Sequence, residues 1–149
     1  MSLPAAQAIQ AWVNARKDLV GRNRPLSRGA YLMGDPVRSP AHGAYALLFR
    51  EPGTGAGGTS GIVAEDNDPS FARVTAHVYA GTIAAAEKAA CALSNAWQDL
   101  NGCPEPCGGT GITVMVADDF SEPGYTPMPG SGGELHMFTT SATFLLRAS

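Results

Sequence analysis

The sequence predicts an α+β fold: a mainly antiparallel sheet with two helices packed on one face. Two segments carry apolar residues at helical spacing, and five carry strand patterns. Most of the strands follow one another without the crossover helix that a parallel sheet needs, so the expected order is α-β-β-β-α-β-β. The 149 residues, 44% of them hydrophobic, suit one domain over 1–149 with a core of its own.

The first helix is predicted over residues 4–20. Ser2 is expected to cap it, Pro4 suits its first turn, and Gly21 is expected to end it. A stripe at helical spacing would face the core, with the stem of the arginine laid along it. The stripe consists of Ile9, Trp12, Val13, Arg16 and Val20.

Three strands follow, over 30–33, 42–50 and 71–80. The third alternates cleanly between a small apolar face and a larger, mixed face. Ala72, Val74, Ala76, Val78 and Ala80 form the small face, and Phe71, Arg73, Thr75, His77 and Tyr79 form the other. The small face is expected to lie beneath a helix.

The second helix is predicted over 83–100, with Thr82 as its N-cap and Asn101-Gly102 at its end. Its many alanines favour a helix and allow close approach to a sheet. The expected buried stripe is Ile83, Ala86, Ala90, Leu93, Trp97 and Leu100.

Two last strands are predicted over 111–117 and 134–147, joined by a long loop over 118–133. In the first of them, Ile112, Val114 and Val116 are expected on one side. In the last strand, threonines and a serine at 139, 141 and 143 form a polar face. Such a face is expected to meet solvent or to line a channel.

A glycine-rich stretch, GTGAGGTSG, follows the second strand. Gly53, Gly55 and Gly58 have the spacing of a dinucleotide-binding turn, which requires a helix directly afterwards. The next residues are acidic and end at Pro69, so they disfavour both the helix and a bound phosphate. We therefore predict a long connection over 52–69, and connections of this length are often functional.

Cysteines and aspartates offer weaker candidates for chemistry. Cys103 and Cys107 could hold zinc or form a disulfide, but two free thiols are favoured, because the spacing is C-x₃-C and the histidines lie on other elements. Four aspartates could gather a divalent cation, although solvated loop charges are the simpler interpretation. They are Asp66, Asp68, Asp118 and Asp119.

The three histidines do not pair with a nucleophile at any defensible spacing. They are His42, His77 and His136, and no serine or cysteine stands in a triad-like relation to them. His77 is expected to be exposed on its strand. We therefore predict that the protein is not an enzyme.

Charge is divided unevenly along the chain. The net charge is −3, which argues against nucleic acid as the main partner. Residues 1–50 nevertheless carry +5 and residues 51–149 carry −8, so copies could stack head to tail. The N-terminus has no secretory signal pattern and no run is long enough to span a membrane, so we expect a soluble protein that stays where it is made.

The strand-turn-helix stretch from Arg73 to Ala90, RVTAHVYAGT running into the alanine-rich helix, resembles tail terminator proteins of long-tailed (siphovirus-type) bacteriophages of actinobacteria. The Pro/Gly-rich EPGYTPMPG at 122–130, followed by a long last strand, is also similar to that family. The element order resembles lambda-type tail terminators, and the resemblance covers nearly the whole chain. The motifs that carry the resemblance are a strand-turn-helix pattern and not a set of catalytic residues.

The resemblance implies a structural protein without cofactor or catalytic residues. Family members form a homohexameric ring on the last ring of the tail tube, end tail polymerisation and present a new face to the head-tail connector. The implied location is the head-proximal end of the virion tail, after assembly in the host cytoplasm, with DNA at most passing through the lumen. The 52–69 loop and the two cysteines at 103 and 107 depart from the family pattern.

We expect the two long loops, 52–69 and 118–133, to order on assembly and the uneven charge to supply opposed faces. The candidate interface residues are Arg50, Gly55, Gly58, Asp66, Asp68, Arg73, His77, Asp118, Asp119 and Tyr125. Alternatives are another head-tail joining or head completion protein, a tail tube subunit, or a small ligand-binding or enzymatic α+β domain.

Overall fold

The computed structural model describes residues 3–35, 43–51, 70–103, 105–127 and 135–148. Its elements are α1 (Ala5–Ala15), β1 (Ala30–Leu32), β2 (Tyr45–Arg50), β3 (Ser70–Ala80), α2 (Ile83–Gln98), β4 (Ile112–Asp118), β5 (Gly124–Thr126) and β6 (His136–Ala148). This confirms the predicted α+β fold and the predicted order of its main elements.

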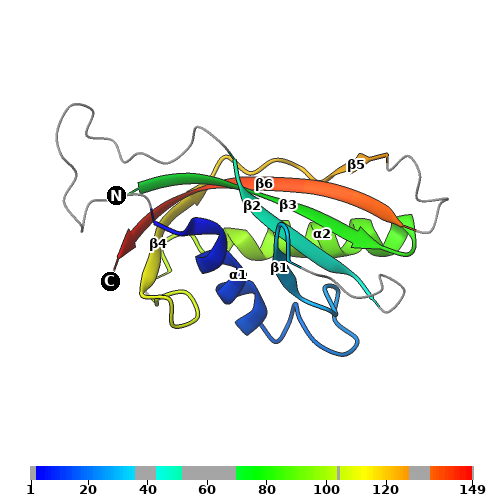
Figure 1. Cartoon of the computed structure of the whole chain (residues 1–149), viewed down its shortest axis with the longest axis horizontal. Helices are drawn as coiled ribbons and strands as arrows, with labels where there is room; N and C mark the ends of the chain where they lie inside the picture. Colours follow the sequence, from blue (N-terminus) through cyan, green and yellow to red (C-terminus); the bar gives the residue numbers. More distant parts are fainter. Residues whose placement is uncertain (1–2, 36–42, 52–69, 104, 128–134, 149) are drawn as a thin grey trace.

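The strands form one six-stranded sheet in the order β1-β2-β3-β6-β4, with β5 also paired to β6. β1 runs parallel to β2, and the other pairings are antiparallel. Both helices lie on the same side of this sheet (Figure 1). The long pairing of β3 with β6, from Ser70–Leu146 to Ala80–His136, forms the centre of the sheet.

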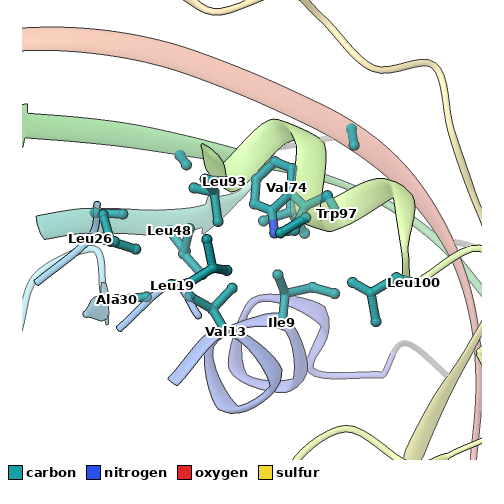
Figure 2. Packing of buried hydrophobic residues seen from close by; sticks show 14 of the residues in the cluster. Ile9, Val13, Leu19, Leu26, Ala30, Leu48, Val74, Leu93, Trp97 and Leu100 are labelled. Carbon is teal, nitrogen blue, oxygen red and sulfur yellow. The ribbon is translucent and has the colours of Figure 1, made fainter. Parts of the chain in front are cut away.

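The core lies between the two helices and the small-residue face of β3. The predicted alternation is confirmed, because alanines and valines at even positions from Ala72 to Ala80 are fully or nearly fully buried. Figure 2 shows Ile9 and Val13 of α1 near Trp97 and Leu93 of α2. Trp97 packs edge-on against Phe144 of β6, with ring centroids 5.5 Å apart.

The first helix is shorter than predicted. It ends at Ala15 rather than Val20, because Arg16 takes an extended conformation with ψ of 109°. The following turn then buries Leu19, whose carbonyl accepts the Leu26 N–H at 2.9 Å. A continued helix would leave Leu26 without this contact, so tertiary packing overrides the helical pattern. The expected cap, Ser2, lies outside the described residues.

The second helix begins as predicted, with the Thr82 hydroxyl accepting the Ala85 N–H at 3.1 Å. It ends at Gln98, two residues earlier than expected, and the chain continues in a turn that still buries Leu100. Ile83 was wrongly assigned to the buried stripe and is 49% exposed. The next two residues are exposed as well, so the buried face of α2 begins only at Ala86.

The segment around 118–133 holds two departures from prediction. Val116 is 38% exposed rather than buried beside Val114, because a register shift between them turns the chain over and buries Ala117 instead. The predicted loop also contains a strand, β5, whose Tyr125 lies opposite Phe138. Residues 112–126 thus run along β6 for most of its length.

This segment covers part of the polar face predicted for the last strand. Ser121 donates its N–H to the Ser141 carbonyl at 2.9 Å and accepts the Ser141 N–H on its hydroxyl at 2.8 Å. Ser141 is consequently buried instead of facing solvent or a channel.

Candidate functional site

The sheet face opposite the helices is the candidate functional surface. Within the described part of the chain, no helix lies on it (Figure 1). Its side chains are the odd-numbered residues of β2 and β3, because alternate residues of a strand point to opposite faces. We call this surface the outer face.

Aromatic rings gather on the outer face where β2 meets β3. Tyr45 and Tyr79 stack with centroids 5.2 Å apart, and Phe49 meets His77 edge-on at 5.1 Å. Tyr31 of β1 completes this aromatic cluster by an edge contact with Tyr45 at 6.3 Å. Cross-strand aromatic pairs of this kind stabilise a sheet; here Tyr45 is buried, and the other rings of the cluster remain partly exposed.

The titratable rings of the aromatic cluster are uncharged at neutral pH. Burial lowers the pKa of His77, so its imidazole is neutral near pH 7. Burial also raises the pKa of Tyr45 and Tyr79, although the cation of Arg28 partly opposes the shift at Tyr45. The Arg28 guanidinium carbon lies 5.4 Å from the Tyr45 ring centroid. The cluster is therefore neutral, with one cation at its margin.

A polar network occupies the other half of the outer face, around Arg73. Its guanidinium donates to the Ser141 hydroxyl at 2.8 Å and to the Thr143 hydroxyl at 3.0 Å. It also bonds the Asp119 carboxylate at 3.0 Å and lies 3.7 Å from the Glu51 carboxylate. Asp119 has a positive φ of 51°, an unusual value for this residue that places its carboxylate and carbonyl on the same arginine.

Arg73 therefore joins three segments: β3, β6 and the connection from β4 to β5. The Thr75 hydroxyl donates to Glu51 at 2.6 Å and extends the network to the end of β2. Because each charge has a partner, the network orients the backbone near 119–121.

The structure brings two of the sequence-predicted interface residues, Arg73 and Asp119, into direct contact. His77 shares their face but is half-buried beneath Phe49 and Tyr79, so the prediction that it is exposed was wrong. The prediction was based on the polar residues of the same strand face. It did not take into account that Phe49 of the neighbouring strand packs against His77.

Of three other predicted interface residues, Arg50 and Tyr125 lie away from the outer face, whereas Asp118 is paired with Thr143, whose hydroxyl accepts from Arg73 on that face. Arg50 donates to the carbonyls of Leu3 and Phe71, both at 3.3 Å. Asp118 is exposed at the end of β4, and Tyr125 is 48% exposed beside His136. The remaining four, Gly55, Gly58, Asp66 and Asp68, lie outside the described residues.

The structure describes both cysteines and some of the aspartates that the sequence offered as metal ligands or reactive groups. Cys103 and Cys107 are free thiols, and burial raises the pKa of Cys107 to about 11. Over the described ranges, no three His, Cys, Asp or Glu side chains are grouped to hold a metal ion. In the same part of the chain, no helix is long and apolar enough to cross a membrane.

Sequence reasoning missed the aromatic cluster. Its signal is visible in the alternation of β2, where Tyr45, Leu47 and Phe49 fall on one face. The pairing that places Tyr45 opposite Tyr79 could not be inferred without the register of the sheet.

Comparison with known proteins gives a match among the solved structures. No protein-family model matches the chain, and no curated protein matches it in sequence. A solved structure described as the virion of a native gene transfer agent particle contains a chain of similar fold, with a TM-score of 0.57 and 13% sequence identity. The match covers 99% of this chain and 96% of that one. At this identity it shows a shared fold.

Proposed function

We propose that this chain is a structural virion protein that forms a ring, caps the tail tube, ends tail polymerisation and joins the tail to the head connector. The observation that carries the proposal is the end-to-end fold match to a virion chain, which covers 99% of the residues here. A match over both whole chains supports the proposal that 1–149 acts as one domain. The sequence resemblance to tail terminators supplies the specific role.

The candidate surface fits a joint protein better than an enzyme. The outer face offers stacked rings and an arginine that binds hydroxyl, carbonyl and carboxylate groups. Such groups suit packing against another protein, because aromatic side chains and arginine are enriched in protein interfaces. We propose a non-enzymatic role without cofactor, located at the head-proximal end of the virion tail.

The ten sequence-predicted interface residues remain part of this proposal. Arg73 and His77 would contribute through the outer face, and Asp118 and Tyr125 through the β4 and β5 side of the sheet. Proposed partners are further copies of this chain, the tail tube protein on one ring face and the connector protein on the other. DNA would at most pass through the lumen.

The test is a tube-termination assay. Tail tube protein from the same genome is polymerised with increasing amounts of this chain, and tube lengths are measured by electron microscopy. We expect shorter tubes with added density at one end only. A control uses an equal amount of an unrelated protein of similar size.

Other results would favour the alternatives. Incorporation along the whole tube would indicate a tube subunit, and binding to DNA-filled heads without tubes would indicate a head completion protein. No binding to either, together with a thermal shift on adding nucleotide or a divalent cation, would indicate a ligand-binding domain.

A further inference from the structure

We propose that the two opposite edges of the sheet bind each other between copies of this chain, in a head-to-tail contact. The β1 edge comprises Arg22, Arg24, Arg28, Leu32 and Met33, and the β4 edge comprises Glu105, Met115, Val116, Asp118 and Glu122. The inference rests on the proposed ring, to which it assigns the lateral surfaces.

The topology places β1 and β4 at opposite ends of the strand order, with residues 22–28 leading into β1 and Glu122 following β4. β1 is the first strand of the path β1-β2-β3-β6-β4 and β4 is the last. The segment 16–28 leads into β1, and Arg28 donates its N–H to the Ala44 carbonyl at the start of β2. A contact between different surfaces of two copies is heterologous, and it closes into a ring when the rotation permits.

The charges of the two edges are complementary. Arg22 and Arg24 are exposed, and Arg28 lies over Tyr45. The segment 22–35 holds three arginines and one acidic residue, Asp35, so it is net positive. The nearby Asp18 is bound by Arg16 at 2.7 Å.

On the opposite edge, no lysine or arginine occurs in the sequence between Lys88 and Arg147. Glu105, Asp118 and Glu122 are exposed there, whereas Asp119 is bound by Arg73. Arg147 lies opposite Thr113, near the start of β4. Asp118 is the last residue of this strand, and Glu122 follows it. Opposite charges on two surfaces steer association and select against wrong partners.

Each edge also carries exposed apolar groups. Met33 is 45% exposed beside a groove of about 300 Å³ lined by residues 4–7, 32–33 and 48–50. On the β4 edge, the register shift exposes Met115 and Val116, at 37% and 38%. An apolar centre with a charged rim is the usual composition of a specific interface.

The contact would use side chains rather than strand pairing. On β1, Asn14 binds both the N–H and the carbonyl of Ala30. On β4, Asn101 accepts the Ala117 N–H at 3.3 Å, and the Met115 carbonyl accepts the Gly102 N–H at 3.2 Å. Edge groups satisfied in this way resist the addition of another strand.

The test is charge reversal with complementation. One variant carries Arg22→Glu and Arg24→Glu, and the other carries Asp118→Lys and Glu122→Lys. Molar mass is measured by light scattering across a concentration series at low salt, for the full chain. We expect wild type to associate, each variant to raise the dissociation constant at least about tenfold, and an equimolar mixture of the variants to restore association.

Control variants and the wild type distinguish failure of this edge contact from failure of the proposed ring. Glu87→Lys and Lys88→Glu reverse exposed charges on α2 and should associate like wild type, with all melting temperatures unchanged. Association of wild type and both edge variants alike would overturn this contact but leave the proposed ring intact. A wild type that stays monomeric throughout would also overturn it, while end-capping of tubes could still support the proposed function.

Discussion

Gly29 stands where the chain enters β1, with a φ of +85° that disfavours any residue with a side chain. A Cβ at this position would lie 2.8 Å from Asn14 Oδ1, the atom that accepts the Ala30 N–H. Gly29→Ala should therefore lose about 2 kcal/mol of unfolding free energy, measured by urea denaturation. Gly34→Ala is the matched control, because its φ is +97° but nothing lies within 4 Å. An equal loss in both would show that the Asn14 contact contributes nothing.

Cys107 provides a pH prediction at the same scale. Burial raises its pKa from an ordinary value of 9.0 to about 11, so the unfolded chain releases this proton first. The unfolding free energy should then fall from about pH 9 to pH 11, by at most about 1.4 kcal/mol per pH unit from this group. Urea unfolding of wild type and Cys107→Ala across this range isolates the effect, since the variant lacks it. Parallel pH profiles would contradict it.

At the scale of elements, sequence reasoning succeeded where one periodicity ran uninterrupted. The alternation from Phe71 to Tyr79 predicted the buried face of β3, and Thr82 marked the start of α2. It failed where tertiary contacts decide. Arg16 ends α1 so that Leu19 can be buried, and the β4 bulge depends on its partner strand. Gly124–Thr126 is too short, between two prolines, to show a strand pattern.

Contacts between elements also fix the structure of the outer face. Arg73 holds the connection at 119–121 against β3 and β6, and thereby positions β5. Arg73→Met should lower the unfolding free energy by about 1–2 kcal/mol and speed amide exchange at 121–126 about tenfold. Exchange in α2 should stay unchanged and serves as the internal reference. Unchanged exchange at Ser121 would mean that its own bonds to Ser141 suffice to hold the segment.

At the scale of the whole molecule, the surfaces proposed for assembly are separate from the core that stabilises the fold. The core is formed by the helices and the inner face of the sheet, whereas the charged edges and the aromatic cluster lie outside it. A charge-poor protein, with 15% charged residues, can thus keep complementary charge where copies would meet. This separation allows assembly variants that leave the fold unchanged.

Deletion of residues 53–61 would test directly whether the surfaces for assembly are separate from the fold. The pairing that fixes β2 against β3 reaches Glu51, whose N–H donates to the Arg73 carbonyl at 2.9 Å, and β3 resumes at Ser70 opposite Leu146. Deleting 53–61 retains these pairs and halves the connection, which changes the free energy of loop closure by only about 0.6 kcal/mol. We expect a melting temperature within about 2 °C of wild type and weaker capping of tail tubes, measured by calorimetry and tube length. A large fall in melting temperature would instead show that the segment belongs to the fold, and full capping activity would show that assembly does not use it.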